Sequence, residues 1–326
     1  MFTRYITRTL LPAMLLAAGI VGSASADSYP SRPIRLIAPI AAGGLTDTLA
    51  RLVAAGLADK LGQAVIVENK PGAGGIIGME AAAQAKPDGY TMILVYQGVA
   101  AVNASLYPHL PYNTMRDFVP VAGLGNFSLV LVTNSRTGIH SVRDLLEIAK
   151  AKPNSLSYAS AGNATTSHLT MELFKLKGGI QAVHVPYKGE GPANTDVIGG
   201  RVDIAFSSLA SVAPLIKSNR LVPLGVTSHE RSRILPTVPT IAEAGVPGFE
   251  AVGWYGLLAP AGTPPAIVNK LEHAVADVLK QPSIQARLDA LGVTAQASSS
   301  AEFGQQIRSE TEKWREVIKK SHIKIN

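Results

Sequence analysis

Short runs of β-forming apolar residues alternate with segments of helical spacing along most of this chain, and this alternation restricts the fold more than any other feature. Residues 34–40 have the composition of a buried strand, and apolar side chains then recur at helical spacing between Leu49 and Leu61. Gly62 follows, as is common where a helix ends. Alternating strands and helices are typical of parallel sheets covered by helices. We therefore predict an α/β fold.

The alternation continues to the C-terminus and predicts two lobes. Strands are expected at 34–40, 64–67, 90–96, 129–133, 156–159, 182–185, 203–206, 223–227 and 254–259. Helices are expected at 49–61, from a glycine loop to about 85, from a Ser141 cap to about 151, and at 167–177, 265–280, 283–290 and 301–320. The last three helices have no strands of their own to cover, so we expect them to return to the first lobe.

This arrangement gives a first lobe of residues 27–128 and 252–326 and an inserted second lobe of residues 129–251. The two connections between the lobes, near 125–131 and 252–257, would form a hinge.

The N-terminus has the composition of a secretory signal peptide. Arg4 and Arg8 precede an apolar run at 10–21, and Ala24-Ser25-Ala26 supplies the small-x-small pattern of a cleavage site. The run is shorter than the roughly 20 residues that span a bilayer. We predict cleavage near Ala26 and a mature chain in the periplasm, with an uncleaved membrane anchor as the alternative.

Composition excludes several classes of protein. The chain has no cysteine, which excludes thiol catalysis, iron–sulfur clusters, cysteine-ligated zinc and a lipid anchor on cysteine. Its formal net charge is +7, and the two arginines of the leader leave +5 for the remainder. Basic and acidic residues are interspersed, so we expect no nucleic-acid partner. A mild positive field would attract an anionic solute.

Ligands of open α/β sheets lie beyond the carboxyl ends of the strands, so the loops that follow the expected strands are the candidate site. These loops are 41–47, 71–76, 97–99, 160–166, 186–189 and 207–208. The first two are rich in glycine and each opens a helix. Glycine lets the backbone approach a ligand, and the N–H groups of a first helical turn can hold an anion. The alternative is that these glycines only make tight turns.

Enzymatic and nucleotide-binding motifs are missing from the sequence. Ile77 breaks the spacing of a dinucleotide fingerprint, and no Walker motif, G-x-S-x-G or H-E-x-x-H occurs. The histidines never pair at a metal-ligand spacing. We expect no catalytic residue, metal or cofactor. Ser167-His168 begins a helix, as a cap or as pocket wall, and Asp203 either binds a cationic group or fixes a turn.

Many ordered motifs give the chain a strong resemblance to the tripartite tricarboxylate transporter receptor (Bug) family of extracytoplasmic solute receptors. The resemblance runs from about Tyr29 to the C-terminus. The motifs that carry it lie at 39–44 with Asp47 and Ala50-Arg51, 67–75, 87–91, 158–162, 167–169, 185–189, 200–203, 235–240, 243–245 and 259–264.

The resemblance implies a two-lobed periplasmic-binding-protein fold of type II, with two hinge crossings. The expected function is capture of a small mono-, di- or aromatic carboxylate by a monomer that is not an enzyme. The expected partners are the permease subunits of a tripartite tricarboxylate-type membrane transporter. A membrane sensor kinase is the alternative partner, and an enzyme on the same fold is a remote one.

The resemblance also implies the residues of the site. The first-lobe loops would hold a carboxylate through backbone N–H groups and bridging waters, at Ala41, Ala42, Gly43, Gly44, Leu45, Thr46, Gly72, Ala73, Gly74, Gly75 and Ile76. The second lobe would contact the other end of the ligand through Ser160, Asn163, Thr165, Thr166, Ser167 and Asp203. We also expect pocket-wall contacts from Tyr96, Gln97, His168 and Tyr187.

Two departures from the family pattern leave the ligand's identity open. Tyr96-Gln97-Gly98-Val99 stands where small Ser or Thr residues are common, and Ser207-Ser208 stands where Asp or Asn is common. A flat aromatic acid beside Tyr96 is one hypothesis, and a larger polar ligand is another.

Overall fold

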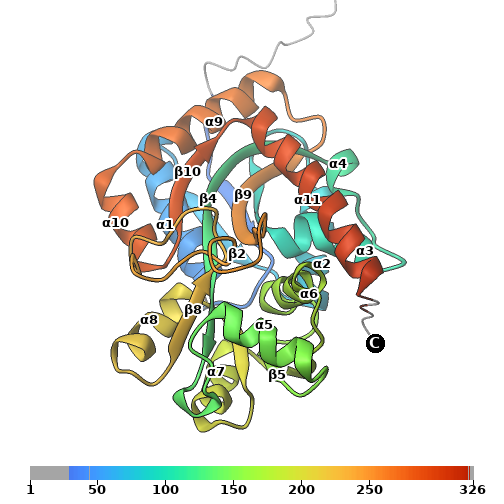
Figure 1. Cartoon of the computed structure of the whole chain (residues 1–326). Helices are drawn as coiled ribbons and strands as arrows, with labels where there is room; N and C mark the ends of the chain where they lie inside the picture. The colour runs from blue at the N-terminus through green and yellow to red at the C-terminus, as the bar shows by residue number, and fades with distance from the viewer. Residues whose placement is uncertain (1–28, 44, 322, 324–326) are drawn as a thin grey trace, which may run out of the picture.

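The computed structural model describes residues 29–43, 45–321 and 323 (Figure 1). The predicted signal peptide lies outside these residues. The first elements are β1 (Ile34–Ala38), α1 (Leu45–Leu61), β2 (Val65–Asn69), α2 (Ile76–Ala83) and β3 (Thr91–Tyr96). β1 pairs in parallel with both β2 and β3, which is the βαβαβ unit that the apolar pattern predicts. Shorter helical turns lie at η2 (Ala73–Gly75), η3 (Gly98–Val102), α3 (Asn103–Leu106), α4 (Thr114–Asp117) and η4 (Ser135–Thr137).

One long strand, β4 (Phe118–Thr133), joins two halves of the sheet. From Phe118 to Ser128 it pairs antiparallel with β9 (Val252–Pro260), which also pairs antiparallel with β3. From Leu129 onward it pairs instead with β7 (Ile204–Ser208) and β8 (Val222–Val226). Over the described residues this gives a ten-stranded sheet, and Figure 1 shows β4 running through both halves. The sequence predicted only residues 129–133 of this strand.

The second half of the sheet contains a parallel core with β6-β5-β7 in that order. Its elements are α5 (Val142–Ala151), β5 (Ser157–Ser160), α6 (Thr166–Gly178), β6 (Val183–Pro186), α7 (Glu190–Gly199), β7 (Ile204–Ser208), α8 (Leu209–Lys217) and β8 (Val222–Val226). Because the three core strands are parallel, their carboxyl ends and the loops that follow lie at one edge. α7 and α8 were not predicted.

The C-terminal elements are α9 (Pro265–Leu279), α10 (Pro282–Ala290), β10 (Thr294–Ser298) and α11 (Ser300–Lys320). β10 pairs antiparallel with β4, so the prediction that this part of the chain adds no strand was wrong. The segment Thr-Ala-Gln-Ala-Ser is short, polar and mostly exposed, so it lacks the apolar alternation by which strands are predicted.

Helix α11 contacts the cores of both halves. Phe303 and Ile307 pack in a cluster with strands β1 and β3, whereas Trp314, Val317 and Ile318 pack in a cluster with α5, α6 and β7. A capping box between Ser299 and Glu302 begins the helix. The expected assignment of α11 to the first lobe therefore describes the packing of its first half only.

The core is built from strand and helix faces, as the sequence indicates. Met171, Leu173 and Phe174 of α6 are all buried, which confirms them as core residues. Among the described residues no helix combines the length and the apolar character needed to cross a bilayer.

Candidate functional site

The glycine loop between β2 and α2 has an unusual backbone. Gly72, Ala73, Gly74 and Gly75 have φ values of 123°, 47°, 64° and 89°, so four successive residues have positive φ. For Ala73 this is a strained conformation, and such strain is typical of ligand-binding sites. No side chain caps α2, which starts at Ile76, so the N–H groups of its first turn have no side-chain acceptor. Two N–H groups are already used within the loop, because Gly75 donates to the carbonyl of Gly72 at 2.9 Å and Ile76 donates to the carbonyl of Ala73. The uncapped first turn of α2 that follows is the part of this segment suited to an anion.

The loop between β1 and α1 is held by a buried carboxylate. The N–H of Gly43 donates to Asp47 Oδ2 at 2.9 Å, and Arg51 and Asn69 donate to the same carboxylate at 3.1 and 2.9 Å. These hydrogen bonds, with that of Gly43 the strongest influence, lower the pKa of Asp47 to about 2. Gly44 lies outside the described residues. Asp47 thus positions the predicted 41–46 loop.

Phenol groups lie against both glycine loops. Tyr255 Oη lies 3.4 Å from Thr46 Oγ1. A methyl group placed on Gly75 would lie 3.2 Å from Tyr96 Oη, and one on Gly74 would lie 2.9 Å from Tyr107 Oη. Burial raises the pKa of both Tyr96 and Tyr255 to about 12, so these hydroxyl groups keep their protons and can donate. This places Tyr96 beside the glycine loop, and its expected contact with a ligand stays a prediction.

The loop between β5 and α6 is ordered by its own side chains. Ser160 Oγ lies 2.6 Å from His184 Nε2, and the N–H of Ala164 donates to His168 Nδ1 at 3.0 Å. Thr165 Oγ1 donates to the carbonyl of Gly162 at 2.8 Å. Ala164 has a φ of 59°. The only other non-glycine residues with positive φ in the described chain are two asparagines and Ala73, so both strained alanines lie in predicted binding loops.

These contacts separate two groups among the predicted second-lobe residues. Ser160, Ser167 and His168 are buried, and their hydrogen bonds go to the loop itself or, for Ser160, also to His184 of β6. Asn163 is exposed and Thr166 half-buried on the same loop, so they can meet a ligand. His168 and His184 stack at 4.0 Å between ring centroids, and burial lowers the pKa of His184 to about 4. Both imidazoles therefore serve as neutral supports for the loop.

Tyr187 supports the same loop from β6. Its N–H donates to the carbonyl of Ser160 at 3.0 Å, and its own carbonyl lies 3.1 Å from a methyl group placed on Gly162. Its hydroxyl donates to Asp196 at 2.7 Å.

Two residues predicted to contact the ligand are engaged elsewhere, and we remove them from the site. Gln97 is buried, and its Nε2 donates to Glu310 Oε2 at 2.6 Å and to the carbonyl of Val252 at 3.2 Å. Asp203 precedes β7, at the edge of the sheet remote from Ser160. Its carboxylate accepts from the N–H and hydroxyl of Ser157, both at 2.7 Å, so it fixes the strand ends.

Sequence reasoning missed Glu190, the first residue of α7. Its carboxylate accepts from the N–H of Ser208 at 3.2 Å and from the Ser208 hydroxyl. Ser208 ends β7 and precedes α8, so both residues lie at the same edge of the sheet as Ser160. The candidate loop predicted after the strand at 182–185 covers residues 186–189 and ends one residue before Glu190. The neighbouring Ser207 donates to Asn194 at 2.6 Å and is buried.

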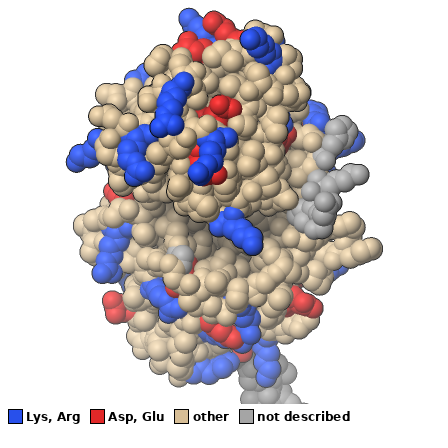
Figure 2. Space-filling model, turned by 90° about the horizontal axis from the view of Figure 1, so that it is seen from below, with Lys and Arg blue, Asp and Glu red and all other residues tan. Residues whose placement is uncertain are grey.

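The pairing along β4 links the two halves of the candidate site. Ser208, which holds Glu190, pairs with Leu129 of β4, and Tyr255 pairs with Gly125 four residues away on the same strand. The negative charge of Glu190 also contributes, after burial, to the raised pKa of Tyr255. Figure 2 shows a face hollowed across its middle, with acidic and basic side chains scattered over it and no continuous basic patch. Helices α6, α7 and α8 at this edge have no side-chain cap, whereas Ser141 and Ser299 cap α5 and α11 elsewhere.

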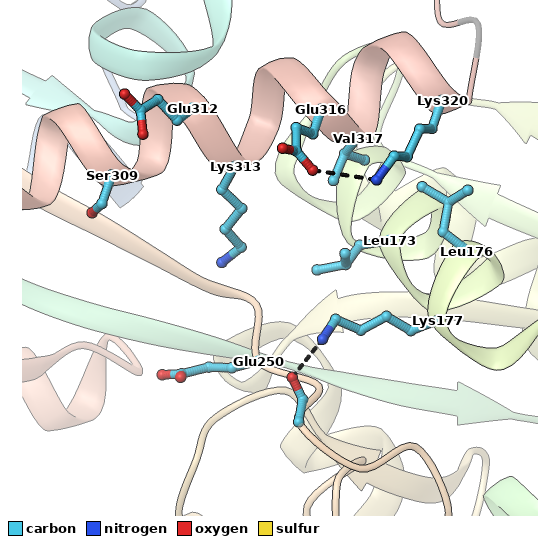
Figure 3. A pocket seen from close by; sticks show the side chains of 11 residues that line it. Leu173, Leu176, Lys177, Glu250, Ser309, Glu312, Lys313, Glu316, Val317 and Lys320 are labelled. Atoms are coloured by element: carbon cyan, nitrogen blue, oxygen red, sulfur yellow. Dashed lines mark hydrogen bonds and ion pairs between the residues drawn. The ribbon is translucent and has the colours of Figure 1, made fainter.

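A second hollow lies away from these loops, between α6, α11 and residues 248–250 (Figure 3). Its volume is about 750 Å³. Its lysines are already paired: Lys177 donates to the carbonyl of Gly248 at 2.7 Å, Lys320 lies 3.3 Å from Glu316, and Lys313 lies 3.1 Å from Glu310. We therefore assign no small anion to it. Over the described residues no group of three or more His, Asp or Glu side chains is arranged to hold a metal ion.

Comparisons with known proteins identify the family of the chain. Residues 49–323 match the family described as tripartite tricarboxylate transporter family receptor. Protein BugT of Bordetella pertussis is 38% identical over 312 residues, covering 95% of this chain and 96% of BugT.

Solved structures confirm the predicted periplasmic-binding-protein fold. The periplasmic binding protein BugD superimposes with a TM-score of 0.75 at 32% identity, covering 91% of this chain and 99% of BugD. Rpa4515 of R. palustris, solved with adipate, has a TM-score of 0.79 at 35% identity, covering 91% and 99%. The chain therefore belongs to the tripartite tricarboxylate transporter receptor family of solute-binding proteins.

Proposed function

We propose that this protein is a periplasmic receptor that captures a small carboxylate and delivers it to the permease of a tripartite tricarboxylate-type transporter. The observation that carries the proposal is the loop at 72–75, in which four successive positive φ values precede the uncapped first turn of α2. Such a turn offers N–H groups and a partial positive charge to an anion without needing an arginine.

The neighbouring groups suit a carboxylate. Backbone N–H groups of Gly74 and of the first turn of α2 after Ile76 would bind one end of the ligand, directly or through water. The protonated hydroxyls of Tyr96 and Tyr255 supply further donors at the same wall. A related protein has been solved with adipate, which supports a carboxylate as the shared chemical feature of the ligands.

The strand pairing suits closure of two lobes around the ligand. In the proposed division, residues 27–128 and 252–326 form one lobe and residues 129–251 form the other. β4 and β9 cross between them side by side, with Phe127 paired to Gly253 and Ser128 to Val252. Ligand binding would shift an equilibrium between open and closed arrangements by bending this two-stranded connection. The proposed export to the periplasm depends on the leader and its cleavage near Ala26.

A panel of small carboxylates tests the proposal, with the primary amide of each acid as its matched control. The mature protein is titrated while tryptophan fluorescence and melting temperature are recorded. We expect at least one acid to raise the melting temperature while its amide does not, because the amide lacks the negative charge that the N–H groups stabilise. If acids and amides bind equally, or no acid of a broad panel binds, the proposed function is refuted.

A further inference from the structure

Glu190 brings a carboxylate to a site whose first half is built to receive an anion. The residue starts α7, directly after the loop that follows β6, and Ser208 at the end of β7 holds its carboxylate through two hydrogen bonds. These bonds fix the side chain at the edge of the sheet where the second-half loops meet the first. Each carboxylate oxygen accepts one bond from Ser208, so each has a lone pair left for a further donor.

No positive group of the described residues forms an ion pair with Glu190. Within residues 29–43, 45–321 and 323 it forms no ion pair, although eleven ion pairs are present in that part of the chain. Lys188, two residues earlier, is exposed and makes no ion pair with it. A half-buried carboxylate with no counter-ion repels a second anion and attracts a cation.

Aromatic residues lie on the first-half side of the site. Ser208, which holds Glu190, and Tyr255 pair with Leu129 and Gly125, four residues apart on β4, and the rings of Tyr255 and Phe127 lie 5.2 Å apart at a tilt of 32°. Tyr96 and Tyr107 bring their hydroxyl groups to Gly75 and Gly74. The faces of such rings attract ammonium groups, and the attraction strengthens when water is excluded. A carboxylate beside several rings is a favourable combination for a cation.

We propose that Glu190 selects ligands that carry an ammonium group at the end remote from their carboxylate, in preference to dicarboxylates. This inference rests on the proposed carboxylate site at the glycine loops. It assigns the two ends of a zwitterion: the carboxylate to the N–H groups near Gly75, and the ammonium to Glu190 and the ring of Tyr255.

Matched ligand pairs test the proposal by calorimetry on the mature protein. Each pair has an amino acid and a dicarboxylate of equal carbon number: 4-aminobutanoate with succinate, 5-aminopentanoate with glutarate, 6-aminohexanoate with adipate, and 4-(aminomethyl)benzoate with terephthalate. In the best-binding pair we expect the amino acid to bind tighter by roughly 10- to 100-fold, which is the range of a charge-assisted hydrogen bond.

Glu190→Gln keeps an oxygen that can accept from Ser208, so it preserves the local fold while removing the charge. We expect this variant to lose the preference for the amino acid and to gain affinity for the dicarboxylate. Glu147→Gln, on the exposed face of α5, is the matched control for net charge and should leave both affinities unchanged.

The outcomes separate the two proposals. If dicarboxylates bind at least as tightly as their amino-acid partners, and Glu190→Gln changes neither, the inference about Glu190 is overturned while the carboxylate receptor stands. If no member of any pair binds the wild-type protein, the carboxylate site itself is refuted together with this inference.

Discussion

Gly75→Ala is the most informative single change, because Gly75 lies where the backbone of the glycine loop enters α2. Its φ is 89°, and a methyl group there would lie 2.4 Å from Val99 Cγ1, 3.2 Å from Tyr96 Oη and 3.3 Å from the carbonyl of Pro39. The left-handed conformation costs a non-glycine residue about 1–2 kcal/mol. Overpacking against the buried Val99 adds about 1–3 kcal/mol. The variant should also lose carboxylate affinity, because relief of the clash displaces the N–H groups of the loop.

Gly62→Ala supplies the control. Gly62 also has a positive φ, of 68°, but nothing lies within 4 Å of the added methyl group, and the residue follows α1 away from the loops. Gly62→Ala should lose only the free energy of the left-handed backbone conformation, about 1–2 kcal/mol of stability, and its affinity for the carboxylate should be unchanged. Urea unfolding followed through the two tryptophans gives the stabilities, and calorimetry gives the affinities. Equal stability and equal affinity in the two variants would refute the packing argument and the role of the loop.

Three further predictions concern buried polar groups. The pKa of Asp47 is about 2 in the fold, against an ordinary value near 3.8, so the charged carboxylate stabilises the protein by about 2 kcal/mol above pH 4. This stabilisation is lost as the pH falls toward 2. In urea titrations, Asp47→Asn should therefore be less stable than wild type at pH 7 and equally stable near pH 2. The pKa of His184 is lowered from 6.5 to about 4, so the unfolded chain binds the proton at a higher pH than the folded protein does. The free energy of unfolding should therefore fall by on the order of 3 kcal/mol between pH 6.5 and 4. A His184→Gln variant with the same pH dependence would contradict this. Glu310 accepts hydrogen bonds from Gln97 Nε2 and Trp314 Nε1 at 2.6 and 2.8 Å. Glu310→Gln should therefore lower the free energy of unfolding by about 1–3 kcal/mol and shift the tryptophan emission. Unchanged thermal unfolding would argue against this network.

The parts of the fold that sequence predicts well are those with strong local signals. Residues 34–40 and 90–96 are apolar runs, and both contain observed strands, β1 and β3. β4 was predicted only over residues 129–133, because Pro120, Gly123 and Gly125 interrupt its first part. Those glycines accommodate Phe303 and β10, which are contacts that no local pattern records. The antiparallel pairing of β9 with β3 and β4 likewise depends on distant segments.

In the candidate site too, the residues with a local sequence signal were predicted, whereas those placed by distant contacts were not. The glycine loop at 72–75 was predicted because glycine after a strand and before a helix has a direct backbone reason, and its φ values agree. Gln97 was misplaced because its position after Tyr96 does not reveal that the turn directs its side chain toward α11. Asp203 was included because the family resemblance implied it, although the strand expected at 203–206 begins with this residue and the candidate loops follow the strand ends. Glu190 was missed because its place depends on contact with Ser208, eighteen residues away.

The most direct test of the account is a crystal structure of the protein with the carboxylate that binds best in the panel. We predict that the ligand's carboxylate oxygens accept hydrogen bonds, at about 2.7–3.2 Å or through one water, from N–H groups between Gly74 and Ile77. We also predict that the remote end of the ligand faces Glu190 and Tyr255. A carboxylate bound away from the 72–76 loop, with that loop contacting only solvent, would contradict the central claim.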